Sequence, residues 1–281
     1  MDADEQRTTS RDRWEASAAG WDRCADAHAA GALPVAHWMV DHLRVQPGQT
    51  VLEVGAGLGD VGFLAAELLH PGGRLICTDG AEAMVEAARR RAQERGIANA
   101  EFRTMEIEWL DQPAASVDGI LGRFAYMLVP DPEAGLREAR RVLKPGGRIA
   151  LAVWDAAERN PQISAPGAAA RELDLAPPAD PGDPGPFALS APGAVAELLD
   201  AAGFDDVETE ALDLEFAQPS LDAWWETTTG MSPTLRELLP TLSPADTYRL
   251  RDALDARWAP FVRDDGQVVI PGRALVAAAS A

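Results

Sequence analysis

The sequence predicts an α/β fold in which helices cover both faces of a mainly parallel sheet. Two features of the chain predict it. Between residues 50 and 154, short apolar segments alternate with longer segments whose apolar residues recur every three or four positions. The first apolar segment ends at a cluster of glycines, and Pro-Gly-Gly follows two of the longer segments. Such alternation is typical of parallel strands joined by right-handed helical crossovers.

The N-terminal segment is expected to form two helices. Between Trp14 and Ala25, apolar residues recur at spacings of three or four, which gives one apolar helix face. Pro34 is expected to end this helix, because proline has no backbone N–H to donate. Residues 35–43 then form a second helix, and Pro-Gly at residues 47–48 predicts a turn into the sheet.

The next hundred residues are expected to hold five strands and three helices. The predicted strands are residues 51–54, 74–78, 100–104, 117–122 and 148–154. The predicted helices are residues 62–69, 81–95 and 132–143. Gly96 is the expected cap of the second of these helices.

The second half of the chain is expected to complete the sheet. Its predicted elements are a proline-rich loop at 176–186, a helix at 193–202, a strand at 207–216, a mainly helical segment at 221–261 and an apolar strand at 267–278. We expect the last two strands to pair as a hairpin, which gives a seven-stranded sheet, with the helical segment in their connection as a cap. The predicted organisation is an N-terminal cap segment (1–49), a core (50–155) and a C-terminal completion (156–281).

Composition and charge exclude several classes of protein. The chain has 281 residues, 47% of them hydrophobic, and no apolar run of about 18 residues that would span a membrane. Its net charge of −20 opposes binding to nucleic acid and to anionic membranes. The acidic N-terminus and two isolated cysteines, without metal-ligand spacing, favour a cytoplasmic protein without a metal. We expect a small-molecule partner; the oligomeric state stays open.

The segment between Glu53 and Asp60, E-V-G-A-G-L-G-D, carries the strongest functional signal. Glycines at a turn from strand to helix allow a ligand to approach the backbone closely. Asp79 follows twenty residues after Gly59, at the end of the second predicted strand. A carboxylate at that place accepts hydrogen bonds from ribose hydroxyls. The segment therefore predicts a nucleoside site.

Charge distinguishes between two nucleosides. Residues 57–62 satisfy G-x-G-x-x-G, which by itself is weak evidence for a dinucleotide. A pyrophosphate requires a helix N-terminus without competing anions, yet Glu53 and Asp60 flank this loop. S-adenosylmethionine carries a cationic sulfonium and an ammonium group, and acidic neighbours would favour it.

The sequence V-L-E-V-G-A-G-L-G-D resembles the first motif of the class I S-adenosylmethionine-dependent methyltransferases, which have a Rossmann-like fold. The resemblance extends from about Trp14 to Trp154 and is closest to the small-molecule group related to ubiquinone and menaquinone C-methyltransferases. It implies that the glycine loop borders the methionine part of the cofactor, that Asp79 binds the ribose, and that Gly80 and Met84 lie beside the adenine. Glu106 matches the acid near the adenine amino group, where Asp is more common. The residues expected to bind the cofactor are Glu53, Gly55, Ala56, Gly57, Gly59, Asp79, Gly80, Met84, Met105, Glu106, Ile107 and Arg123.

The acceptor is expected to be a small molecule with an apolar or aromatic face. Six of the eight tryptophans lie in the N-terminal segment and the helical cap. Helices there would close over the carboxyl ends of the strands, where ligands bind in such folds. Arg123 either orients the cofactor or an acidic acceptor, or forms a structural ion pair. Candidates for a general base are His28, His37 and Tyr126, and no spacing singles out one of them.

Two alternatives to methyl transfer stay open at the level of sequence. One is an NAD-dependent oxidoreductase, which the acids around the glycine loop disfavour. The other is a cofactor-binding protein or cyclase that shares the methyltransferase fold without transferring methyl groups. The favoured prediction is direct in-line transfer of a methyl group to a small molecule, without a covalent enzyme intermediate.

Overall fold

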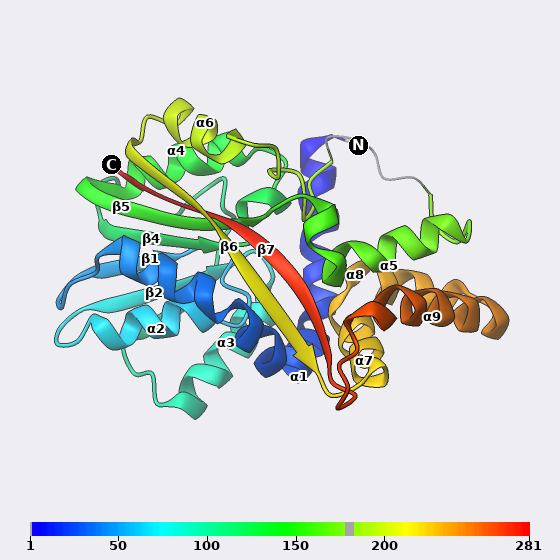
Figure 1. The fold of residues 1–281 in the computed structure, drawn as a ribbon. Coiled ribbons are helices and arrows are strands. Elements are labelled where there is room, and N and C mark those ends of the chain that lie inside the picture. Colours follow the sequence, from blue (N-terminus) through cyan, green and yellow to red (C-terminus); the bar gives the residue numbers. More distant parts are fainter. Residues whose placement is uncertain (1, 178–182) are drawn as a thin grey trace.

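The computed structural model describes residues 2–177 and 183–281, and its centre is the seven-stranded sheet that the sequence predicts (Figure 1). The strands lie in the order β3-β2-β1-β4-β5-β7-β6. Pairing is parallel from β3 to β5, whereas β7 runs antiparallel to both of its neighbours. The strands are β1 (Thr50–Glu53), β2 (Arg74–Asp79), β3 (Ala100–Thr104), β4 (Val117–Arg123), β5 (Leu143–Trp154), β6 (Asp205–Gln218) and β7 (Val268–Ser280).

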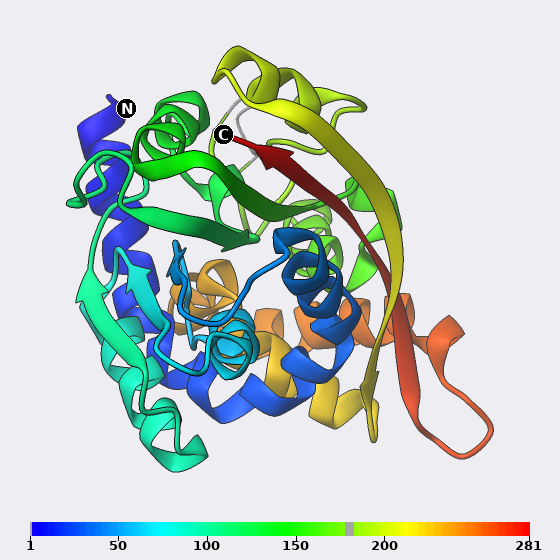
Figure 2. The ribbon, with the colours of Figure 1, turned by 90° about the vertical axis from the view of Figure 1, so that its left-hand side faces the viewer.

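Helices lie on both faces of the sheet, and a group of helices forms a cap beside one end of it (Figures 1 and 2). The helices are α1 (Ala3–Leu43), α2 (Asp60–Leu68), α3 (Glu82–Arg95), α4 (Pro132–Val142), α5 (Pro161–Glu172), α6 (Ala194–Ala201), α7 (Leu221–Met231), α8 (Pro233–Leu238) and α9 (Pro244–Trp258). Helices α7 to α9 occupy the connection between β6 and β7, as the sequence predicts. Of the predicted proline-rich loop, residues 178–182 lie outside the described residues.

The prediction of two N-terminal helices is wrong, because α1 continues through Pro34 as one helix of 41 residues. A proline inside a helix removes one hydrogen bond and bends the axis, but it need not end the helix. On one face of α1 the residues around Pro34 are fully buried, among them Ala32, Val35 and Met39, and this part of the chain packs against the sheet. Their burial offsets the lost bond, and Figure 2 shows α1 changing direction along its course.

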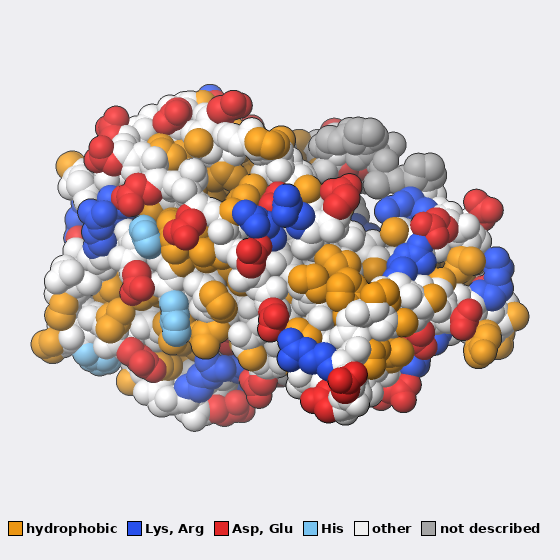
Figure 3. Space-filling view, in the orientation of Figure 1, with side chains coloured by type: hydrophobic (Ala, Val, Ile, Leu, Met, Phe, Trp, Pro, Cys, Tyr) orange, Lys and Arg blue, Asp and Glu red, His pale blue; other side chains and the backbone are white. Residues whose placement is uncertain are grey.

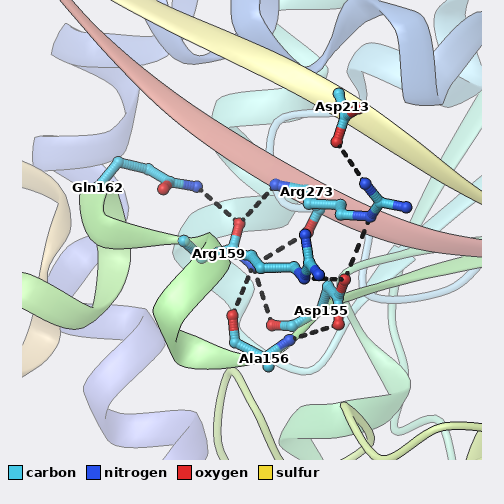
Figure 4. A network of polar contacts seen from close by, with 7 residues as sticks. Asp155, Ala156, Arg159, Gln162, Asp213 and Arg273 are labelled. Carbon is cyan, nitrogen blue, oxygen red and sulfur yellow. Dashed lines mark hydrogen bonds and ion pairs between the residues drawn. The ribbon is translucent and has the colours of Figure 1, made fainter. Parts of the chain in front are cut away.

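Helix α5 is an element that the sequence pattern did not predict. It begins after Asn160, whose fully buried side chain forms the centre of a polar network. Figure 4 shows this network and labels its members Asp155, Gln162 and Arg273. Asn160 donates to the carbonyls of Asp155 (2.9 Å) and Arg273 (3.0 Å) and accepts from the backbone N–H of Arg273 (2.8 Å). The Arg273 guanidinium lies between Asp155 (3.3 Å) and Asp213 (2.8 Å). The network therefore joins the end of β5 to β6, to β7 and to the start of α5.

One group of packed, buried residues extends from Ala32 in α1 to Ala279 in β7. This shared core does not test the expected boundaries at residues 49 and 155, and the division of the chain stays a prediction. None of the helices in the described ranges is long and apolar enough to cross a membrane. On the face shown in Figure 3, acidic and basic side chains are interspersed, so the net charge of −20 does not form a single acidic patch there.

Candidate active site

The glycine loop lies over the carboxyl ends of the central strands. The N–H of Val54 donates to the carbonyl of Leu121, and the N–H of Ala56 donates to the carbonyl of Thr78, each at 2.9 Å. Gly55 has a φ of 56°, and a Cβ on it would lie 2.5 Å from the Cβ of Ala125, in the loop after β4. A glycine is therefore required where these two loops meet.

Asp79 is held in a fixed position at the end of β2. One carboxylate oxygen accepts from the N–H of Gly57 and the other from the N–H of Ala81, both at 2.9 Å. Burial raises the pKa of Asp79, and these two hydrogen bonds oppose the rise. A Cβ on Gly57 would meet no atom within 4 Å, so the backbone here borders open space.

That open space is a pocket of about 1060 Å³, including the part open to solvent. Its walls come from the loops after β1, β2, β3 and β4 and from the N-terminal half of α1. Most of the expected site residues are brought together here. Those that line the pocket are His28, Gly55, Ala56, Gly57, Asp79, Gly80, Met84, Glu106, Ile107 and Arg123.

Helix α1 closes the pocket with one face, which we call the α1 stripe. Its members are Arg7, Ser10, Arg11, Trp14, Trp21, Ala25 and His28. The apolar face that the sequence predicts is part of this stripe, but Arg7 and Arg11 were not predicted as site residues. Arg7 and Arg11 continue the spacing of three or four residues from Trp14 toward the N-terminus, so the helical periodicity could have identified them. Arg11 approaches Glu106, with 3.7 Å between their charged atoms.

Of the three candidate bases, His28 alone lines the pocket. Its ring stacks on Phe216 at a centroid distance of 5.6 Å and meets Trp21 edge-on at 5.1 Å. Burial and the charge of Arg123 lower the pKa of His28 to about 3. His37 is exposed and lies outside the pocket. Tyr126 is buried behind it, and its hydroxyl has no hydrogen-bond partner among the described residues.

Comparison with known proteins identifies the family. A family model described as a methyltransferase domain matches residues 46–175. The chain is 33% identical over 216 residues to nocamycin O-methyltransferase of Saccharothrix syringae, an alignment that covers 72% of this chain and 77% of that one. The chain belongs to the S-adenosylmethionine-dependent class I methyltransferases. Within that family it is of the small-molecule type, and S-adenosylmethionine is its methyl donor.

Two further similarities agree with this assignment. A ubiquinone/menaquinone biosynthesis C-methyltransferase of Cellvibrio japonicus is 36% identical over 106 residues, which cover 37% of this methyltransferase and 43% of that protein. This methyltransferase thus matches less than half of that relative's length. The crystal structure of the YcgJ protein from Bacillus subtilis shares the fold, with a TM-score of 0.59, 20% identity and coverage of 88% and 97%. The family decides against the NAD-dependent oxidoreductase.

Three expected cofactor ligands of the methyltransferase lie behind the pocket wall. Glu53 is 2% exposed; it accepts from the N–H of Gly62 at 3.0 Å, and burial raises its pKa to about 7. Gly59, at the start of α2, has a φ of 81°, and a Cβ on it would lie 2.5 Å from the Phe63 ring. Met105 is buried, and its N–H donates to the carbonyl of Asp79. All three lie outside the pocket lining, and their expected contact with the cofactor stays a prediction.

The electrostatic reason for expecting S-adenosylmethionine also needs correction. Asp60 lines the pocket, but three guanidinium groups surround it, at 3.5 Å (Arg91), 3.4 Å (Arg95) and 3.7 Å (Arg123). Glu53 is buried away from the pocket. The flanking acids therefore do not make the loop anionic, and the donor is established by the family rather than by this charge argument.

The pocket nevertheless suits the methyl donor. Gly57 leaves the backbone accessible, and both Asp79 oxygens retain a lone pair beyond the N–H group that each accepts. Met84 and Ile107 supply apolar surface at the same wall, and Glu106 lies beside Gly80. These groups match the needs of an adenosyl group, with hydroxyls to be bound and a flat ring to be packed. Within the described ranges, no group of three or more His, Cys, Asp or Glu side chains could hold a metal ion.

Proposed function

We propose that this methyltransferase transfers the methyl group to an oxygen atom of a flat, mainly apolar small molecule. One observation carries the proposal: a single pocket joins a wall suited to the cofactor to a wall of aromatic side chains. The second wall contains Trp14, Trp21 and Phe124. The similarity to an O-methyltransferase supports oxygen as the methylated atom.

The cofactor would lie along the ends of β1, β2 and β3. Asp79 would bind the ribose hydroxyls, and Met84 and Ile107 would pack against the adenine. Glu106 would lie near the adenine amino group, and Gly55 and Gly57 would border the methionine part. Parallel strands end at the same edge of the sheet, so this order follows from the strand order β3-β2-β1.

The acceptor would occupy the end of the pocket at β4. There Phe124 stacks on Trp154, with 3.8 Å between ring centroids and 8° between ring planes. Leu128 and Val129 extend the apolar surface, and Trp21 of the α1 stripe belongs to the same pocket. Large, rigid aromatic faces bind flat rings through dispersion and loss of water-exposed apolar area.

The protein's main contribution to the reaction would be alignment. When bound, S-adenosylmethionine supplies an electrophilic methyl group on a sulfonium. Holding the acceptor oxygen in line with that group can supply roughly 7–11 kcal/mol of the barrier reduction. Cys24 and Cys77 both lie outside the pocket lining, in agreement with transfer without a covalent enzyme intermediate. His28 is neutral at physiological pH, but a pKa of about 3 makes it a weak base, so it would orient an acceptor rather than deprotonate one. The new methyl–oxygen bond would replace the sulfur–methyl bond, leaving S-adenosylhomocysteine, and the hydroxyl proton would pass to water at the open side of the pocket.

Transfer from methyl-¹³C-labelled S-adenosylmethionine to a metabolite extract tests the proposed acceptor. NMR of the labelled product distinguishes methoxy carbon from methyl on nitrogen or carbon. We expect a methoxy signal, and Phe124→Ala should reduce transfer while binding of S-adenosylhomocysteine persists. Label on nitrogen or carbon would contradict an oxygen acceptor. Cofactor binding without any labelled product would favour a non-methylating protein on this fold.

A further inference from the structure

Arg123 is a largely buried cation that faces the pocket. It is the last residue of β4, its side chain is 12% exposed, and it lines the pocket. Within the described parts of the chain, no atom accepts a hydrogen bond from its guanidinium. The nearest carboxylate oxygen, on Asp60, lies 3.7 Å away. A guanidinium has five N–H donors, and buried ones are ordinarily paired with acceptors.

Asp60 does not balance this charge by itself. Its carboxylate also lies near Arg91 (3.5 Å) and Arg95 (3.4 Å), so it is shared among three guanidinium groups, of which Arg91 also has Asp26 at 3.3 Å. The other nearby acid, Glu53, is buried behind the wall, and its raised pKa keeps it partly protonated near neutral pH. The β4 end of the pocket therefore presents a guanidinium, that of Arg123, whose charge is only partly balanced, although the chain as a whole carries a net charge of −20.

The backbone directly after Arg123 is strained. Phe124 has a φ of 55°, in the left-handed region that a bulky aromatic residue rarely adopts. Its N–H donates to the carbonyl of Ala152 at 2.7 Å, and its ring stacks on Trp154. These contacts hold the strained turn in place. Backbone strain of this kind is concentrated at binding and catalytic sites.

We propose that Arg123 binds an oxyanion of a ligand in this pocket. The inference rests on the proposed function and adds the chemistry that the β4 end would recognise. A planar guanidinium binds a carboxylate through two parallel N–H···O bonds. Two molecules in the pocket could supply that oxyanion: the cofactor, through its amino-acid carboxylate, or the acceptor, through a carboxylate or an ionised hydroxyl.

The first arm of the test compares two cofactor fragments by calorimetry. S-adenosylhomocysteine has the amino-acid carboxylate, and 5′-methylthioadenosine lacks it. If the cofactor supplies the oxyanion, Arg123→Gln weakens binding of S-adenosylhomocysteine about 10- to 100-fold and leaves that of 5′-methylthioadenosine unchanged. Arg95→Gln is the matched control, because Arg95 also approaches Asp60 but lies outside the pocket lining.

The second arm tests the acceptor as the source. Protein saturated with S-adenosylhomocysteine is titrated with benzoate and with benzamide, and binding is followed by NMR. If the acceptor supplies the oxyanion, wild-type protein prefers benzoate and Arg123→Gln removes that preference. Both cofactor fragments then bind as they do to wild-type protein. Thermal unfolding verifies the fold of each variant, and Arg123→Lys, which keeps the charge but not the two-pronged geometry, carries the test if Arg123→Gln does not fold.

Unchanged binding of both cofactor fragments together with no preference for benzoate would overturn the inference and leave the proposed function standing. Wild-type protein that fails to bind S-adenosylhomocysteine would contradict the proposed cofactor site and, with it, this inference.

Discussion

Arg7 and Glu108 form a two-pronged ion pair that joins the first turns of α1 to the loop after β3. The Arg7 Nε and Nη2 atoms lie 3.0 and 2.9 Å from the two Glu108 oxygens, and the Glu108 side chain is 1% exposed. Glu108 also accepts from the N–H of Asp131 at 3.1 Å, and the Arg7 guanidinium lies 4.4 Å from the centre of the exposed Trp109 ring. This pair holds the α1 stripe over the pocket.

We therefore predict that Arg7→Ala loosens the closed pocket. Removing the cationic partner of a buried carboxylate destabilises the contact that it makes. Without this pair, α1 should move away from the pocket more often, and a bound ligand should dissociate faster. We expect dissociation of S-adenosylhomocysteine to become about tenfold faster or more. Stopped-flow measurement of ligand release, with hydrogen exchange of the α1 amides, checks this.

Arg13→Ala is the matched control for Arg7→Ala. Arg13 forms an equally short pair with Glu237 in α8, but both side chains are more than 40% exposed and lie outside the pocket lining. Exposed pairs contribute about 0–1 kcal/mol, so ligand release should change little. Equal effects of the two variants would show that the Arg7 pair has no special role at the pocket.

A second prediction concerns Asp79. If its two oxygens bind the ribose hydroxyls, two charge-assisted hydrogen bonds of about 1.5–3 kcal/mol each are lost in Asp79→Ala. Affinity for S-adenosylhomocysteine should fall on the order of a hundredfold or more, as measured by calorimetry. Glu106→Gln should cost less, because backbone and apolar groups also hold the adenine. An unchanged dissociation constant in Asp79→Ala would refute the role assigned to this residue.

A third prediction is a pH dependence of stability that arises from Glu53. Burial raises the pKa of this carboxyl from 4.5 to about 7 in the folded protein. The folded state therefore binds the proton more tightly than the unfolded state. The stabilisation is fully present below pH 4.5, and it is lost as the pH rises through 7.

Glu53→Gln should remove this dependence. Denaturant unfolding between pH 4.5 and 8 should show that the variant gains up to roughly 3 kcal/mol relative to wild-type protein across that range. Glu94→Gln, at an exposed glutamate, is the control and should follow wild-type protein. Affinity for S-adenosylhomocysteine should persist in Glu53→Gln, because Glu53 lies behind the wall. Parallel profiles for wild-type protein and Glu53→Gln would contradict the raised pKa.

Local sequence patterns predict the sheet and most of its helices, because each of those elements carries its own periodicity. The continuation of α1 through Pro34 was not predicted, because it depends on the burial of neighbouring residues. That burial depends on strands that are distant in the sequence. Helix α5 was missed for a related reason. It contains Pro161 and Pro166, and the network around Asn160 fixes its start.

The site was predictable where one short segment builds it, and less so where distant segments meet. The glycine loop and Asp79 meet as expected. The sequence predicts that Glu53 borders the pocket, but its side chain is buried against the N–H of Gly62. The sequence pattern alone does not show this, because the direction in which a strand residue points depends on the register of the sheet. Arg7 reaches the pocket only because α1 folds back over strand ends about a hundred residues further along the chain.

We propose that one pocket, between the glycine loop and the α1 stripe, holds both the methyl donor and the acceptor. A crystal structure with S-adenosylhomocysteine tests it most directly. We expect the ribose hydroxyls on Asp79, the adenine against Met84 and Ile107, and the sulfur directed toward the space beside Phe124. Ligand density elsewhere, or in this pocket without contact to Asp79, would show that this pocket is not the methyl-donor site proposed here.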